Sequence, residues 1–233
     1  METQFVQCTD VNIAYTENGE GETLLLLHGN SESKKLFKKY QSTYFFDFHT
    51  FALDSRGHGQ SSWNGEYLTI EQFSDDVIEF CRQKEITKAS VIGFSDGGNI
   101  ALYLAKKEPF LFENVIALSP NTLVTGTEKK TLVLMRFFHK MFLILKRIGF
   151  KTDLLIKRFN LMLTDIGLSF EDLASIQTKV HLIYSEHDMI TEEHMISLHK
   201  AIKNSTLYKE MNANHMSEVE KKDVIAHIRK LLV

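Results

Sequence analysis

The chain has 233 residues, of which 43% are hydrophobic and 24% are charged, and its net charge is −3. This length and composition are typical of one large globular domain, or of a domain that carries an insertion. The slightly acidic balance gives no basis for nucleic-acid binding, so we expect no nucleic-acid partner.

Targeting and redox signals are weak. Cys8 and Cys81 follow no metal-binding or disulfide spacing, and we interpret them as reduced thiols of the core. The first residues carry neither a basic nor an apolar leader, and no run reaches the roughly 18 apolar residues of a membrane span. We therefore expect a cytoplasmic protein.

In chain order, short apolar runs alternate with helical patterns. Strands are predicted at residues 5–8, 11–15, 23–27, 49–53, 89–92, 115–118, 180–184 and 207–211. Helices are predicted at 34–41, 69–84, 99–107 and 192–202, and from 217 onward. The first two strands form an antiparallel pair, and the later alternation predicts an α/β fold with a mostly parallel eight-stranded sheet flanked by helices.

The middle of the chain breaks this alternation. Between residues 121 and 176 no strand is predicted and helical patterns dominate. We interpret residues 121–176 as a small helical cap, or lid, inserted into a core made of residues 1–120 and 177–233.

The cap sequence is basic. Residues 128–158 hold nine basic and two acidic residues, a local charge of +7. At 3.6 residues per turn, Arg136, Lys140, Arg147 and Lys151 fall within about 60° of one another, and apolar residues cover much of the remaining surface. We favour an apolar face packed on the domain and a solvated basic face. Docking onto an anionic membrane or an acidic partner is the alternative.

The sequence Gly93-Phe94-Ser95-Asp96-Gly97 lies between a predicted strand and a predicted helix. A Gly-x-Ser-x-Gly at such a turn is typical of a nucleophile elbow, in which the serine takes strained backbone angles and side chains at the two glycine positions would collide. The turn places the hydroxyl at a helix N-terminus, whose dipole favours an oxyanion. Ser95 is the predicted nucleophile.

A serine hydroxyl needs a base, and the base needs an acid that orients it; the chain order in this architecture is serine, acid, histidine. Asp188 follows a late strand and is the predicted acid, with Glu186 as the alternative. His215 follows the last strand and is the predicted base. Three other histidines near or on the preceding helix are expected at the surface: His187, His194 and His199.

The tetrahedral intermediate of acyl transfer carries an oxyanion that needs two backbone donors. The N–H groups of Asn30 and Asp96 are the predicted donors, and Gly29 permits close approach of the backbone. The Asp96 carboxylate would disfavour an oxyanion unless it points away or meets a cation. It is alternatively a group that binds a substrate amine.

Four blocks together resemble the α/β-hydrolase superfamily, in its compact esterase-like branch: His28-Gly29-Asn30, Asp54-x-Arg56-Gly57-His58-Gly59-x-Ser61, Gly93 to Gly98, and the acid and histidine loops. The resemblance implies the α/β-hydrolase fold, a structural role for the Asp54 block, and no metal or cofactor. Two positions that are commonly glycine in relatives are Ser185 and Asn214 here, and neither change removes a catalytic group.

These residues predict a serine hydrolase that cleaves carboxylic esters of small, partly apolar substrates through an acyl-enzyme intermediate. The same triad also serves thioesterases, lactonases, amidases, acyltransferases and hydrolases of carbon–carbon bonds. Two further alternatives are a ligand sensor with slow turnover and a membrane-associated protein that acts through its basic cap.

Overall fold

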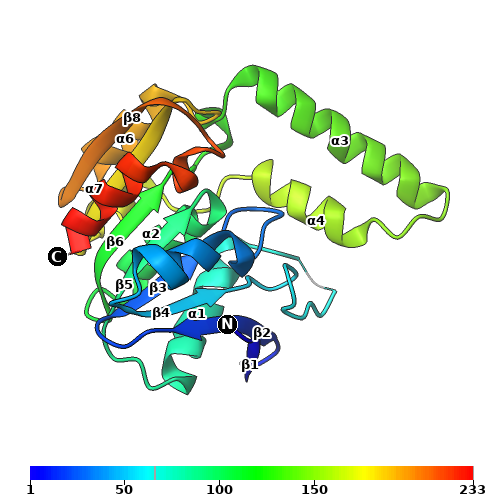
Figure 1. Ribbon diagram of the computed structural model, residues 1–233. Helices are drawn as coiled ribbons and strands as arrows, with labels where there is room; N and C mark the ends of the chain where they lie inside the picture. Colours follow the sequence, from blue (N-terminus) through cyan, green and yellow to red (C-terminus); the bar gives the residue numbers. More distant parts are fainter. Residues whose placement is uncertain (66, 233) are drawn as a thin grey trace.

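A computed structural model describes residues 1–65 and 67–232 and contains one eight-stranded sheet within them (Figure 1). The strands are β1 (Gln4–Gln7), β2 (Asn12–Asn18), β3 (Thr23–Leu27), β4 (His49–Leu53), β5 (Ala89–Phe94), β6 (Phe112–Leu118), β7 (Lys179–His187) and β8 (Ser205–Asn214). Their spatial order is β1-β2-β4-β3-β5-β6-β7-β8, with β1 and β2 antiparallel to their neighbours and the remaining pairs parallel. The predicted mostly parallel sheet is confirmed.

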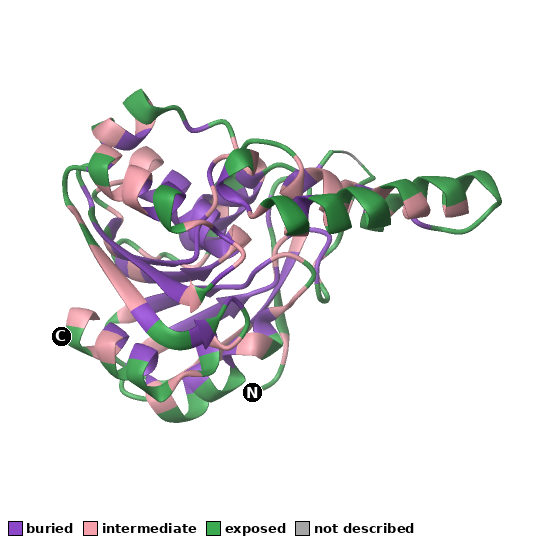
Figure 2. Cartoon of the chain, turned by 90° about the horizontal axis from the view of Figure 1, so that it is seen from above, coloured by how far each residue is buried: buried purple, intermediate pink, exposed green. Residues whose placement is uncertain are grey.

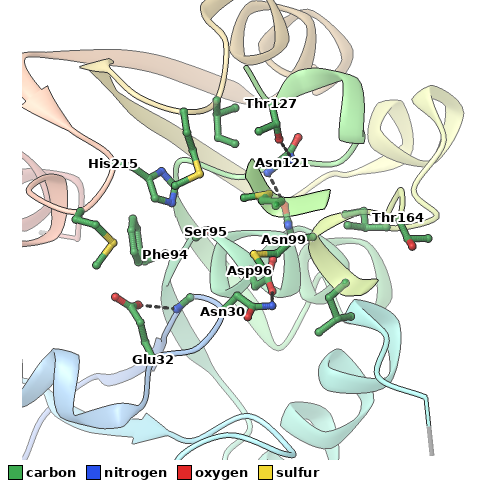
Figure 3. Close-up of a pocket in the computed structure, with 18 residues that line it drawn as sticks. Asn30, Glu32, Phe94, Ser95, Asp96, Asn99, Asn121, Thr127, Thr164 and His215 are labelled. Atoms are coloured by element: carbon green, nitrogen blue, oxygen red, sulfur yellow. Dashed lines mark hydrogen bonds between the residues drawn. The ribbon is translucent and has the colours of Figure 1, made fainter. Parts of the chain in front are cut away.

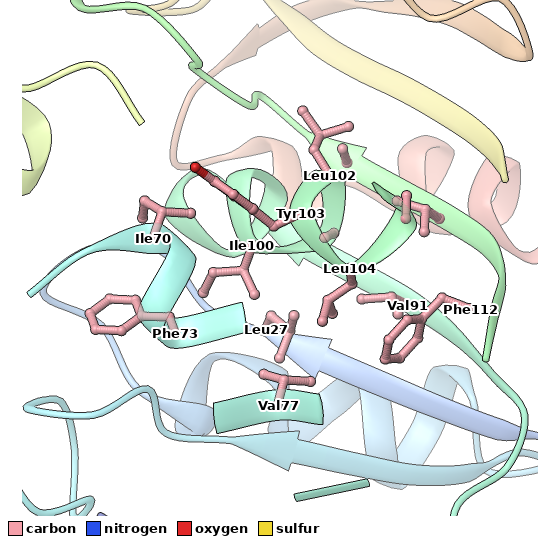
Figure 4. Close-up of a cluster of buried hydrophobic side chains, with 14 of the residues drawn as sticks. Leu27, Ile70, Phe73, Val77, Val91, Ile100, Leu102, Tyr103, Leu104 and Phe112 are labelled. Atoms are coloured by element: carbon pink, nitrogen blue, oxygen red, sulfur yellow. The ribbon is translucent and has the colours of Figure 1, made fainter. Parts of the chain in front are cut away.

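Helices cover both faces of the sheet. The core helices are α1 (Ile70–Gln83), α2 (Asp96–Lys107), α6 (Glu192–Ala201) and α7 (Lys222–Leu232). Because successive strand residues point to opposite faces, Leu25 and Leu27 belong to the cluster that includes residues of α1, α2 and α6. Leu24 and Leu26 belong to a second cluster, which includes residues of α7. A strand buried on both faces therefore consists of apolar residues throughout. Figure 4 shows the larger cluster, around Phe73, and free Cys8 and Cys81 are buried in it.

The helix predicted at residues 34–41 is present as a continuous helical segment, which begins with a 3₁₀ turn, Lys34–Phe37, and ends with a π-helical turn, Tyr40–Tyr44. Asp54, in the loop after β4, accepts hydrogen bonds from the Lys34 backbone N–H (2.7 Å) and from its ammonium group (2.5 Å). This buried pair fixes the start of the segment on the Asp54 loop. A Cβ at Gly59 would lie 2.2 Å from the Asp54 carboxylate, which explains the glycine and fits a structural role for this block.

Three α-helices lie between β6 and β7, after a short 3₁₀ turn at Val124–Gly126: α3 (Lys129–Arg147), α4 (Asp153–Met162) and α5 (Phe170–Ser175). Figure 1 shows α3 and α4 side by side, standing out from the sheet. Helix α5 packs on the core instead, where Leu173 is buried and Asp172 pairs with Lys106 at 2.6 Å. The proposed cap of residues 121–176 thus holds one helix that belongs to the helical layer of the core.

Helix α3 is largely exposed (Figure 2). Among its residues only Leu132 is buried, whereas Val133, Leu134 and Phe137 are more than half exposed. The interpretation in which the apolar face packs on the domain is therefore wrong for most of this helix, because much of its apolar surface faces solvent. No helix in the described ranges combines the length and the apolar content needed to cross a bilayer.

Candidate active site

Ser95 occupies a sharp turn between β5 and α2. Its φ of 54° and ψ of −116° lie in a region that side-chain-bearing residues rarely adopt. A Cβ at Gly93 would lie 2.1 Å from the Gly97 carbonyl oxygen, and a Cβ at Gly97 would lie 2.0 Å from the Leu27 carbonyl oxygen. The turn therefore admits only glycine at both positions, for the reason that the motif indicates.

His215 and Asp188 meet at the ends of β8 and β7. The Nδ1 atom of His215 lies 2.7 Å from Oδ1 of Asp188, and both side chains are buried. The His215 ring also packs on Phe94, with 4.8 Å between ring centroids. Burial acts to raise the pKa of Asp188, but the hydrogen bonds from His215, Ser119 and the Ile190 N–H hold it below its ordinary value. Asp188 is thus a carboxylate placed to orient the imidazole.

Ser95 and His215 line the same cavity, of about 120 Å³ (Figure 3). Within the described residues, Ser95 Oγ forms no hydrogen bond to another side chain. Contacts between a nucleophile and its base are often long before substrate binds and tighten in the reacting complex. The structure thus places the predicted nucleophile and base on one cavity, and the predicted acid is hydrogen-bonded to that base.

The alternative acid, Glu186, points elsewhere. Its carboxylate accepts a hydrogen bond from the Asn212 N–H (2.9 Å) and lies 3.7 Å from the exposed His187. Asp188, in contrast, reaches His215 because the loop folds back through a bond from its N–H to the Ser185 carbonyl (3.2 Å). The geometry therefore favours Asp188 over Glu186 as the partner of His215.

His194 is not a surface residue, so that expectation is wrong. Its side chain is buried, and its Nε2 accepts a hydrogen bond from the Thr122 N–H at 3.2 Å. The ring packs on Gly126, where an added Cβ would lie 2.4 Å away. Burial lowers the pKa of His194 to about 4. His194 is a neutral ring that holds the segment after β6 against α6.

The two predicted oxyanion donors lie on facing loops of the cavity. In the part of the chain that the structure describes, neither the Asn30 N–H nor the Asp96 N–H donates to another protein group. The Asn30 amide donates to Asp96 Oδ2 (3.0 Å) and to the Arg158 carbonyl of α4 (3.0 Å) (Figure 3). Burial raises the pKa of Asp96, while hydrogen bonds from Asn30 and Asn99 act against that rise.

The sequence analysis missed a second buried acid behind Asp188. Glu218 is fully buried, and its Oε2 lies within hydrogen-bond distance of Ser119 Oγ and Ser185 Oγ, 2.7 Å from each. Ser119 Oγ also bonds to Asp188, yet a hydroxyl carries one proton and cannot donate to two carboxylates. Burial and the charge of Asp188 raise the pKa of Glu218 well above its ordinary value, so Glu218 is the protonated member.

Further residues of the cavity were also missed, and the polar ones among them carry hydrogen-bond acceptors. Glu32 accepts from the Gly29 N–H (3.1 Å), and its pKa is raised by burial. Asn121 donates to Thr127 (2.8 Å), but among the described residues its buried Oδ1 has no partner. The remaining lining is largely apolar: Met135, Leu161, Met162, Ile166, Met189 and Ile190. No lysine or arginine lines the cavity, and the described ranges hold no metal-ligating cluster.

Comparisons with known proteins agree with this architecture. A model of a family described as alpha/beta hydrolase fold matches residues 22–142. A probable alcohol acetyltransferase from Cyberlindnera jadinii is 30% identical over 99 residues, which are 42% of this chain and 28% of that protein. An sn-1-specific diacylglycerol lipase from Xenopus laevis is 33% identical over 111 residues, 46% of this chain and 35% of that protein. The chain thus spans about a third of the length of these curated relatives.

Among solved structures, a bacterial membrane phospholipase A superposes with a TM-score of 0.79 at 20% identity, covering 99% of this chain and 85% of that one. At this low sequence identity, the superposition shows only that the two proteins share a fold. The family match covers the part of the sheet that carries Ser95, and the superposition extends over nearly the whole chain.

Proposed function

The chain belongs to the α/β-hydrolase family, which confirms the predicted fold, and on that premise we propose that it is a serine hydrolase of carboxylic esters. The observation that carries the proposal is the strained elbow of Ser95, which shares a cavity with the hydrogen-bonded pair of His215 and Asp188. A nucleophile, a base and an orienting acid in this arrangement serve acyl transfer.

In the proposed reaction, Ser95 Oγ attacks the ester carbonyl carbon while His215 Nε2 takes its proton. The Asp188 carboxylate stabilises the resulting imidazolium, and the N–H groups of Asn30 and Asp96 donate to the oxyanion. His215 then returns the proton to the departing alcohol oxygen, which leaves an acyl group on Ser95. A water molecule that gives its proton to His215 releases the acid and restores the hydroxyl.

The cavity supports a small substrate. Its volume of about 120 Å³ is well below that of a site for a drug-sized ligand, and methionine and isoleucine side chains provide an apolar wall. Acyl chemistry also agrees with the names of two relatives, an acetyltransferase and a lipase. We therefore propose an ester with a short, partly apolar acyl or alcohol portion.

A fluorophosphonate probe tests this proposal. We expect the folded protein to be labelled on the peptide that contains Ser95, as located by mass spectrometry, and heat-denatured protein to remain unlabelled. Nitrophenyl esters of graded acyl length should show an optimum among the short chains. A folded protein that stays unlabelled, or that is labelled on another serine, would contradict the proposal and favour the slow ligand sensor.

The charge of the cavity predicts a substrate preference. Because Glu32 and Asp96 face the cavity and no lysine or arginine does, acetylcholine should be cleaved with a kcat/KM about tenfold above that of its neutral isostere, 3,3-dimethylbutyl acetate. The preference should fall as the pH drops through the raised pKa of Asp96, since the protonated acid carries no charge. Asp96→Asn should remove most of it, and a variant that keeps the full preference would contradict this role of Asp96.

A further inference from the structure

The outer surface of α3 presents two stripes that run along the helix. At 100° per residue, Val133, Leu134, Phe137 and Ile144, together with Ile148 just after the helix, fall within an arc of about 100°. These five side chains are between 55% and 66% exposed. The adjoining arc of about 40° holds Lys129, Arg136, Lys140 and Arg147, all of them exposed. An apolar stripe and a basic stripe therefore face solvent side by side.

The inner surface of α3 fixes this orientation. Phe138 and Phe142 pack on Phe159 of α4, with ring centroids 6.3 and 5.4 Å apart. Leu132 is buried, and Met135 lines the candidate active-site cavity. Because that side contacts the protein, the two stripes are left in solvent, and Figure 2 shows that most of α3 is exposed.

The basic stripe is not neutralised within the protein. Helix α3 contains no acidic residue. Lys130 and Lys146 pair with Glu128 and Asp153, but across the described ranges no salt bridge is formed by the side chains of the basic stripe. Four unpaired cations thus border an apolar stripe on a molecule whose net charge is −3.

We propose that α3 docks in the interface of an anionic lipid bilayer. The apolar stripe enters the boundary between headgroups and acyl chains, while the basic stripe meets lipid phosphates. The stripe spans about 22 Å along a helix that stands out from the body, so a flat surface reaches its whole length. Charge complementarity alone would also suit an acidic protein, but five large apolar side chains in one continuous stripe favour a bilayer.

Vesicle flotation tests the proposal independently of any hydrolase activity. We expect binding to vesicles of phosphatidylcholine with about 40 mol% phosphatidylglycerol at about 50 mM salt, at least about tenfold weaker binding at about 500 mM salt, and little binding to pure phosphatidylcholine. Arg136→Glu/Lys140→Glu should lower the affinity for anionic vesicles by about 100-fold or more, and Phe137→Ser/Ile144→Ser by about tenfold.

The matched control is Lys200→Glu/Lys203→Glu, which makes the same charge change on exposed residues near the end of α6 and should bind as the wild type does. Because Cys8 and Cys81 are buried, a Phe137→Cys variant allows an environment-sensitive dye to be attached at the stripe, and its emission should shift to the blue on binding. Absence of binding at low salt overturns the proposal, as does equal loss in the α6 control or a dye that stays in water.

Discussion

Ser95→Ala is expected to lower kcat/KM for a short nitrophenyl ester by about 10⁴- to 10⁶-fold, because it removes the hydroxyl that attacks in the proposed covalent step. Alanine retains the Cβ of serine at the strained φ of 54°, so the turn and the helix after it should persist. The loss should therefore appear in kcat, with KM and the melting temperature close to wild-type values. Steady-state kinetics and thermal unfolding measure the two quantities on the same preparation.

Ser197→Ala on α6 is the matched control, since the Ser197 hydroxyl donates a hydrogen bond to the Glu193 carbonyl of the same helix (2.8 Å). Its activity should equal that of the wild type. A stable Ser95→Ala protein that keeps more than about a tenth of the activity would show that the ester is cleaved elsewhere, and would remove Ser95 from the mechanism.

Local sterics and burial make much of this architecture predictable. The bounds of β3 and β4 agree with the prediction, because a strand buried on both faces is a continuous apolar run that ends where polar loop residues begin. The elbow is predictable because a side chain at Gly93 would clash with the backbone of Gly97, and a side chain at Gly97 would clash with the end of the neighbouring strand β3. Such constraints act within short segments, so a short stretch of sequence is enough to predict them.

Features that depend on distant contacts could not be predicted. Glu218 meets Ser119 across 99 positions and Ser185 across 33, and an acidic residue three positions after His215 carries no local sign that it turns inward. The orientation of α3 is a similar case. Apolar residues lie on several of its sides, so the pattern does not say which side meets Phe159 of α4 and which faces solvent.

Asp188→Asn is expected to lower kcat by about 10⁴-fold. The asparagine can turn its amide N–H₂ toward His215 Nδ1, which favours the wrong tautomer, and it removes the charge that stabilises the imidazolium. Asp188 is suited to this role because the pKa of its carboxyl is held low by its hydrogen bonds, so it is ionised at neutral pH. Its kcat should remain low across the neutral range, and thermal unfolding should show that the variant is folded.

Two other acids near His215 make the prediction specific. Burial and Asp188 raise the pKa of Glu218, and Ser119 can donate its one proton to only one of the two acids. Glu218→Gln keeps the shape of a protonated Glu218 and should cost less than about tenfold in kcat. Glu186→Gln should cost as little, since its carboxylate bonds to the Asn212 N–H outside the cavity. If Glu218→Gln proved as damaging as Asp188→Asn, the charge that holds His215 would have to be shared between two buried acids. A loss of activity in Glu186→Gln alone would instead identify Glu186 as the acid of the triad.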